Sequence, residues 1–237
     1  MMTAIKTSEE ITLMREAGRR LARALREVRE AARPGVALRA LDALAERAIR
    51  EHGDSPAFLG YTPAGAHRSY PASVCISVND EVVHGIPNER ERVLCDGDIV
   101  GLDLGLVHRG FYADMAVTVG VGVIDAAGGR LIDATRGALE AGIAVVRSRA
   151  HVGDIGHAIE AFVKKTPFGI VTELGGHSIG RALHEHPFIP NRASRGSGPI
   201  LRSGMTICIE PMLTEGASAI RRDPDGYTYR TVDGRRS

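Results

Sequence analysis

Residues 98–121 read DIVGLDLGLVHRGFYADMAVTVGV, and this stretch decides the fold. Apolar and β-branched residues on either side of His108-Arg109-Gly110 predict two neighbouring strands. A carboxylate interrupts each strand, Asp103 in the first and Asp114 in the second. If His108-Arg109 forms the loop of a hairpin, the two carboxylates lie directly opposite each other, with Cβ atoms roughly 4.5–5.5 Å apart. Such a pair requires a shared proton or a cation, whereas another register would leave one Asp in solvent.

The rest of the chain predicts helices followed by strands, twice over. Thr7 and Glu10 form a capping-box pattern that opens a helix, and Pro34-Gly35 ends it. A second amphipathic helix runs from Leu38 to near Gly53, and a strand follows at 73–80. After the hairpin, helical patterns at 125–148 and 152–165 precede strand-like segments at 169–174 and 204–212. We therefore expect an α+β fold in one domain, 1–237, with two related lobes at roughly 8–124 and 125–237.

Composition narrows the class of protein. The 237 residues are 43% hydrophobic and 25% charged, which is typical of soluble globular proteins. A net charge of +1 gives no sign of nucleic-acid or anionic-membrane binding. No apolar segment approaches the ~20 residues that span a bilayer, and Met1–Glu10 shows no export leader, so we expect a cytoplasmic protein. The three cysteines lack the spacing of a disulfide framework or a CxxC zinc site.

Two further polar residues stand in segments predicted to be buried. His177 lies between glycines directly after the strand-like 170–174, and Glu210 is the only charge in 205–212. A lone buried Glu is costly unless it is paired or binds a metal. Either residue, taken alone, could equally be structural. Together with Asp103 and Asp114 they form an oxygen-rich donor set that suits Mn, Fe or Co, with Zn possible.

His84 and His184 are two more candidates. His84 follows a probable hairpin turn and has no metal partner at helical or strand spacing, so it could contact substrate or stabilise the turn. His184 follows His177 by seven residues. Two ions that share carboxylates could activate one water for hydrolysis.

These motifs together resemble the type I methionine aminopeptidases. The matching segments follow in order from about residue 8 to the C-terminus, and they are Ser73–Asn79, Val83–Pro87, Asp96–Val100 with the Asp103/Asp114 pair, Gly176–Arg181 with His184, and Ile209–Met212. The resemblance implies a pita-bread fold, in which two αβ lobes surround a curved antiparallel sheet and a metal centre. It also implies removal of the initiator methionine from nascent chains with a small second residue.

The resemblance assigns roles residue by residue. Asp103, Asp114, His177 and Glu210 would bind two divalent ions, while His84 and His184 would contact the substrate and the tetrahedral intermediate. A further set would line the pocket for the methionine side chain, namely Tyr61, Tyr70, Cys75, Leu183 and Tyr227. The expected partners are the N-termini of nascent polypeptides near the ribosome, and the chain is expected to be a monomer.

One departure from the family concerns the last metal ligand. The resemblance implies a second Glu on a final strand after residues 227–235, but no Glu follows Glu215. Asp223, Asp225 and Asp233 lie in turn-like sequence. Either the sequence is cut short and lacks this strand, or the chain is a degenerate paralogue with weakened metal binding.

Three functions follow from these observations. The leading one is a metal-dependent aminopeptidase acting on Met–small-residue termini. The second is a non-catalytic or crippled peptide-binding paralogue, favoured by the missing Glu. The third is an Xaa-Pro peptidase of the same fold, although such relatives usually carry an extra N-terminal domain.

Overall fold

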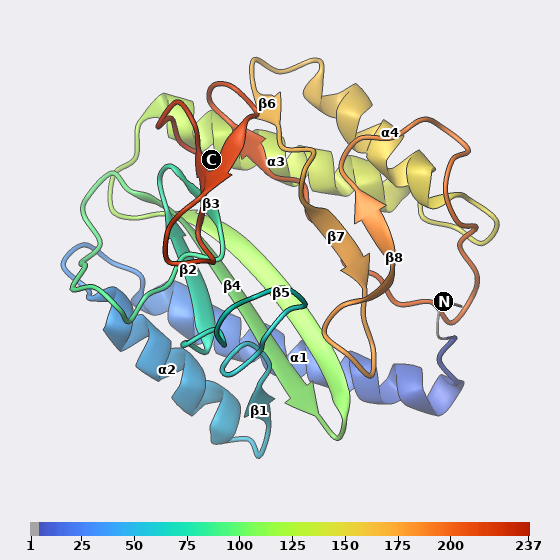
Figure 1. Ribbon diagram of the computed structural model, residues 1–237, viewed down its shortest axis with the longest axis horizontal. Helices are drawn as coiled ribbons and strands as arrows, with labels where there is room; N and C mark the ends of the chain where they lie inside the picture. The colour runs from blue at the N-terminus through green and yellow to red at the C-terminus, as the bar shows by residue number, and fades with distance from the viewer. Residues whose placement is uncertain (1–4) are drawn as a thin grey trace.

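The computed structural model describes residues 5–237, so the first four residues of the segment examined for a leader lie outside it. The chain forms four helices and eleven short or long strands in this range, and they occur in two similar groups (Figure 1). The first group comprises α1 (Ser8–Ala31), α2 (Leu38–Arg50), β1 (Ser55–Pro56), β2 (Val74–Val78), β3 (Glu81–Val83), β4 (Ile99–His108) and β5 (Phe111–Gly120). The second comprises α3 (Ala126–Ala144), α4 (Val152–Val163), β6 (Gly169–Ile170), β7 (Gly175–Ser178), β8 (Glu185–Pro190), β9 (Leu213–Thr214), β10 (Ile220–Arg222) and β11 (Tyr229–Thr231).

The first group is built on β4. This strand pairs antiparallel with β1, β2 and β5, and α1 and α2 lie along the sheet (Figure 1). The predicted capping box at the start of α1 is confirmed, since the Thr7 side chain accepts from the Glu10 N–H and the Glu10 carboxylate accepts from the Thr7 N–H. Buried side chains of the helices and strands, such as Leu21, Leu41 and Leu102, form one hydrophobic cluster.

The second group has its own hydrophobic cluster between α3, α4 and β8, which includes Leu131, Ile155 and Ile189. A third cluster joins the groups, because it combines Phe58 and Cys75 with Leu183 and Tyr227. The groups are also linked by the pairing of β11 with β3. The predicted lobe boundary near residue 124 stays a prediction, but the junction of the groups is where the polar candidates meet.

The predicted hairpin register is wrong by two residues. β4 and β5 are joined by Arg109-Gly110, both with positive φ (50° and 84°), and His108 pairs with Phe111. A two-residue hairpin loop with positive φ at both positions matches the right-handed twist of the strands, which favours this register. Asp103 therefore faces Ala116, and Asp114 faces Gly105. The carboxylates still point to the same face, as diagonal neighbours rather than direct partners.

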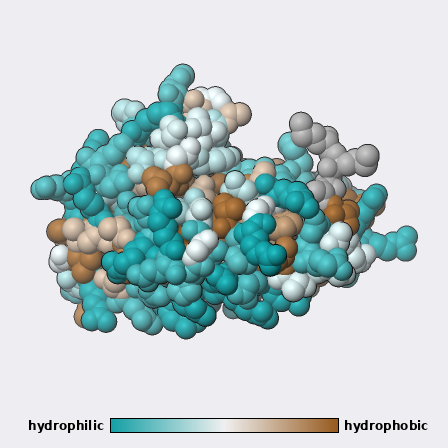
Figure 2. All heavy atoms as spheres, turned by 90° about the horizontal axis from the view of Figure 1, so that it is seen from below, coloured by the Kyte–Doolittle hydropathy of each residue, from teal (hydrophilic) through white to brown (hydrophobic). Residues whose placement is uncertain are grey.

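The strand predicted at 204–212 is also wrong in part. This segment forms only an isolated bridge between Ile207 and Ser178, and the Cys208 N–H donates to the His177 carbonyl, before β9 begins at Leu213. Pro211 has no N–H to continue the ladder. Among the described residues, no helix is long and apolar enough to cross a membrane. The face of the molecule in Figure 2 is mainly hydrophilic, with hydrophobic areas scattered between.

Candidate metal centre

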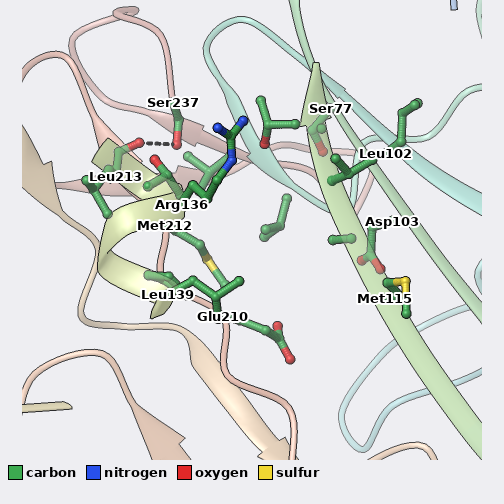
Figure 3. A pocket seen from close by; sticks show the side chains of 18 of the residues that line it. Ser77, Leu102, Asp103, Met115, Arg136, Leu139, Glu210, Met212, Leu213 and Ser237 are labelled. Atoms are coloured by element: carbon green, nitrogen blue, oxygen red, sulfur yellow. Dashed lines mark hydrogen bonds between the residues drawn. The ribbon is translucent and has the colours of Figure 1, made fainter. Parts of the chain in front are cut away.

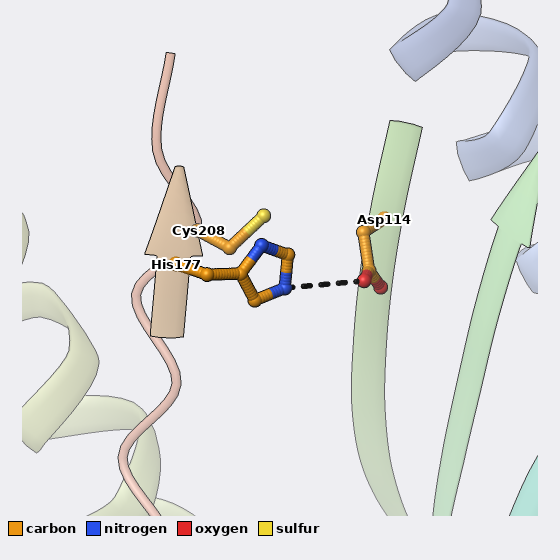
Figure 4. A group of neighbouring side chains, drawn as sticks. All are labelled: Asp114, His177 and Cys208. Atoms are coloured by element: carbon orange, nitrogen blue, oxygen red, sulfur yellow. Dashed lines mark ion pairs between the residues drawn. The ribbon is translucent and has the colours of Figure 1, made fainter. Parts of the chain in front are cut away.

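Four of the predicted site residues converge between the two groups of elements. Asp103 on β4 and Asp114 on β5 come from the first group, while His177 on β7 and Glu210 come from the second. The His177 Nε2 atom lies 3.6 Å from Asp114 Oδ2 and 3.3 Å from Glu210 Oε1. Figure 4 shows the His177 ring directed from β7 toward Asp114. Asp103 in turn interacts with Asp114 and Glu210, so the structure brings the four side chains together, and their role as metal ligands stays a prediction.

The charges of this cluster are not balanced. Burial raises the pKa of Asp103 well above its ordinary value, and the nearby negative charges of Asp114 and Glu210 raise it further. Burial and Asp114 likewise raise the pKa of Glu210 from 4.5 to about 7, although His177 opposes the rise. Burial works against a charge on His177, but hydrogen bonding to Asp114 and attraction to Glu210 outweigh it and raise its pKa. The cluster thus brings three carboxylates together with one imidazole whose pKa is raised.

A divalent cation fits this cluster on an observation independent of the charges. The buried Oε1 atom of Glu210 makes no hydrogen bond with any described residue. Buried polar atoms are almost always satisfied, so an atom left unpaired at a functional site calls for an unplaced ion or water. Carboxylate oxygens with one imidazole nitrogen are donors suited to divalent first-row metal ions.

A cavity of about 410 Å³ opens beside the cluster (Figure 3). Asp103 and Glu210 approach it from opposite sides, and His84 and Asp114 also line it. Most of its remaining wall is apolar, formed among others by Met115, Val117, Leu131, Leu139, Ile207, Ile209, Met212 and Leu213. A second cavity of about 310 Å³ lies toward α1, against Ile11 and Met14. Asp114 and Cys208 line both cavities, so the cluster stands between them.

His84 is placed by a strained turn after β3. Its φ of 59° is unusual for a residue with a side chain. The next residue must be glycine, since a Cβ on Gly85 would lie 2.2 Å from the carbonyl oxygen of Ile76. The Ile76 N–H donates to the Gly85 carbonyl, which fixes the turn against β2. Burial lowers the pKa of His84, so its imidazole is neutral near pH 7.

His184 lies beside the metal candidates without belonging to the carboxylate cluster. Its ring centroid is 4.4 Å from that of His177, and the planes are nearly perpendicular at 72°. Its Nδ1 atom lies 2.7 Å from the Tyr61 hydroxyl. Partial desolvation of its ring and repulsion by the nearby His177 lower the pKa of His184 to about 4. Burial raises the pKa of the Tyr61 hydroxyl. The neutral ring can therefore accept from the Tyr61 hydroxyl, which places its own proton on Nε2.

The five predicted pocket residues belong to one cluster. Tyr61, Tyr70, Cys75, Leu183 and Tyr227 pack in the hydrophobic group that joins the two halves. The rings of Tyr70 and Tyr227 meet edge to face at 5.1 Å. The Tyr70 hydroxyl donates to the Gly85 carbonyl, which connects this cluster to the turn that carries His84. None of the five lines the 410 Å³ cavity, which lies on another side of the carboxylates.

The acidic residues near the C-terminus are engaged elsewhere. Asp223 pairs with Arg230, Asp225 accepts from the Thr228 hydroxyl, and Asp233 accepts from the Ala217 N–H. Glu215 pairs with Arg236 at 2.7 Å. In the part of the chain that the structure describes, these carboxylates stabilise turns and provide no further member of the cluster.

Sequence reasoning missed one residue of the site. Cys208 was assigned no role, yet its Sγ atom, one oxygen of Asp114 and one nitrogen of His177 all lie within 4.8 Å of one another. The signal available in the sequence was its position two residues before Glu210, since extended chain turns such residues to the same side.

Comparison with known proteins identifies relatives over nearly the whole chain. The model of metallopeptidase family M24 matches residues 12–227. Methionine aminopeptidase 1 from Mycobacterium tuberculosis is 44% identical, with 98% of this chain and 87% of that protein covered. Methionine aminopeptidase 1 from Bacillus subtilis is 38% identical, with coverage of 99% and 92%.

Solved structures show the same fold. The crystal structure of methionine aminopeptidase from Thermotoga maritima superimposes with a TM-score of 0.93 at 41% identity, covering 99% of this chain and 92% of that one. A prolidase from Pyrococcus horikoshii gives a TM-score of 0.70 at 20% identity, covering 87% of this chain and 55% of that one, and this likeness concerns the fold alone. The predicted pita-bread fold is therefore confirmed.

Proposed function

The chain belongs to metallopeptidase family M24, and from this premise we propose that it is a methionine aminopeptidase. It is a metal-dependent hydrolase that removes the initiator methionine when the second residue is small. The observation that carries the proposal is that His177 Nε2 lies within 3.6 Å of both Asp114 and Glu210, while the buried Oε1 atom of Glu210 makes no hydrogen bond with any described residue.

Asp103, Asp114, His177 and Glu210 would hold two divalent ions, chosen from Co, Mn, Fe and Zn. When bound, such ions supply Lewis acidity at the scissile carbonyl and make a water more acidic. The four side chains fix where that chemistry takes place, because they come from three strands and one extended segment of a packed junction.

The two histidines would act on the substrate as neutral donors. Neutral His84, held on its strained turn at the wall of the cavity, can donate one N–H to a carbonyl that develops negative charge. His184 is oriented by Tyr61 so that its Nε2 proton is free for the same purpose. The cluster of Tyr61, Tyr70, Cys75, Leu183 and Tyr227 would receive the methionine side chain, since a thioether packs well among aromatic and aliphatic groups.

The partners of the protein follow from this function. We infer that it acts as a monomer on the N-termini of nascent polypeptides near the ribosome, in the cytoplasm. The composition supports no role for nucleic acid, since the net charge is +1.

Release of free methionine from the peptide Met-Ala-Ser tests the proposal. We expect the metal-depleted protein to be inactive and to recover activity with added Mn²⁺. Asp103→Ala should remain inactive at any Mn²⁺ concentration, whereas Asp133→Ala, a change at an exposed carboxylate on α3, should behave as the wild type. Normal turnover by Asp103→Ala would contradict the assignment. The absence of bound metal and of released methionine in the unaltered protein would leave only the peptide-binding alternative.

The same assay with Xaa-Pro peptides separates the third function. The three relatives described above with 38–44% sequence identity are named methionine aminopeptidase, whereas the prolidase has only 20% sequence identity to this chain. Faster cleavage of an Xaa-Pro peptide than of Met-Ala-Ser would contradict the proposed substrate.

A further inference from the structure

Cys208 lies between the metal centre and the hydrophobic cluster that joins the two groups of elements, against which it packs. Its neighbours Ile207 and Ile209 pack on the cluster between α3, α4 and β8. Cys208 does not belong to that cluster, which agrees with the alternation of side chains in extended chain, and all four residues 207–210 border the 410 Å³ cavity. The Cys208 N–H donates to the His177 carbonyl at 2.7 Å, which fixes the backbone next to a proposed ligand. In Figure 4 the Cys208 thiol lies beside the His177 ring, on the side of Asp114.

The distances suit coordination of one ion by three different elements. One atom each of Asp114, His177 and Cys208 lies within 4.8 Å of the other two. A tetrahedral ion with bonds of usual length places its ligand atoms roughly 3.3–3.8 Å apart. Asp114 and Cys208 line both cavities, so space for an ion and a water borders these side chains.

We propose that Cys208 is a ligand of the metal centre. With this ligand, the centre binds a thiophilic ion such as Zn²⁺ or Cd²⁺ more tightly than it would with carboxylates and one imidazole alone. The inference rests on the proposed function, because it needs the same centre to bind divalent ions. On binding, the S–H bond of Cys208 breaks, its proton leaves to solvent and a bond from Sγ to the ion forms, with no change of oxidation state. Sulfur favours soft ions, whereas Mn²⁺ prefers oxygen and gains little from it.

The other two thiols of the chain provide controls. Cys95 is exposed. It follows Leu94 at the edge of the first hydrophobic cluster, and its thiol donates to the Val93 carbonyl in the same loop. Its replacement should therefore not affect the metal centre. Cys75 is buried on β2 and pairs with Asp103 across the sheet, so it is the one other thiol near the carboxylates.

Titration of the metal-free protein with Co²⁺ tests the proposal without an activity assay. Bound Co²⁺ absorbs in the visible range, and a thiolate ligand adds a charge-transfer band in the near ultraviolet. We expect both signals in the unaltered protein and in Cys95→Ser. Cys208→Ser should keep the visible bands and lose the charge-transfer band. Its Cd²⁺ affinity should fall on the order of tenfold or more, while its Mn²⁺ affinity changes by less than about threefold.

The possible results separate the two proposals. Visible Co²⁺ bands without a charge-transfer band in the unaltered protein would overturn the role of Cys208 and leave the metal centre intact. A charge-transfer band that persists in Cys208→Ser and disappears in Cys75→Ser would also overturn it. If Co²⁺ does not bind at all, both the metal centre and the role of Cys208 are wrong. The retained Mn²⁺ affinity of Cys208→Ser shows that this variant is folded.

Discussion

Replacing Glu210 by Gln should stabilise the metal-free protein and abolish its stabilisation by metal. The substitution keeps the shape of the side chain and removes one of the three carboxylate charges. Burial and Asp114 raise the pKa of this group from 4.5 to about 7 in the folded state. That change corresponds to about 3 kcal/mol against folding when the group is ionised. Because 35% of the side chain is exposed, solvent screening reduces the expected effect to about 1–2 kcal/mol.

The sign depends on pH. In the folded protein Glu210 keeps its proton up to about pH 7, whereas in the unfolded chain it loses the proton near 4.5. The unfolded state therefore binds fewer protons between these values, and its stability relative to the folded state rises with pH. The penalty is absent below pH 4.5 and complete above pH 7. Glu210→Gln removes it, so the gain in the free energy of unfolding should be present at pH 8 and vanish near pH 4.

Urea denaturation of both proteins at pH 8 and pH 4, with and without Mn²⁺, measures these effects. Mn²⁺ should raise the midpoint of the unaltered protein at pH 8 and leave that of Glu210→Gln nearly unchanged, because binding to the native state alone stabilises it. Glu51→Gln, at the exposed C-cap residue that follows α2, is the matched control. A metal-free Glu210→Gln protein that is less stable than the unaltered one at pH 8 would refute the reasoning.

Three further variants test one ion pair between the N-terminal segment and β8 and two residues of the site. Lys6→Met should lower the free energy of unfolding by about 2–4 kcal/mol, since it leaves the half-buried Glu185 without its cation. The added change Glu185→Gln should recover part of the loss, and equal stability of Lys6→Met and the unaltered protein in urea would contradict this. Tyr61→Phe should lower kcat about 2–10-fold with unchanged metal content, because one hydrogen bond to His184 is lost; an unchanged kcat would remove Tyr61 from its orienting role. His84→Ala should reduce turnover and retain bound metal, and loss of metal measured by elemental analysis would show that His84 had been given the wrong role.

The sequence predicted those features that depend on local chemistry. Thr7 and Glu10 cap α1 as expected, because the donors and acceptors concerned are three residues apart. Asp103, Asp114, His177 and Glu210 were found because each is a charged or polar group in an otherwise apolar segment. Such a residue is costly to bury and therefore conspicuous in one sequence.

Features that depend on exact register or distant contacts were harder to predict. The register of the hairpin differs from the predicted one because its loop is Arg109-Gly110 and not His108-Arg109, and glycine at position 110 is the residue best suited to positive φ. The contact of Lys6 with Glu185 joins residues 179 positions apart, and no periodicity records such a contact. Cys208 escaped notice because a thiol in an apolar run looks like an ordinary core residue.

Anomalous diffraction from a crystal grown with Co²⁺ tests the metal centre most directly. We expect strong peaks in the space bounded by Asp103, Asp114, His177 and Glu210, within bonding distance of their oxygen and nitrogen atoms. Peaks only at other places, or a Co²⁺-saturated crystal in which these four side chains bind no ion, would contradict the account.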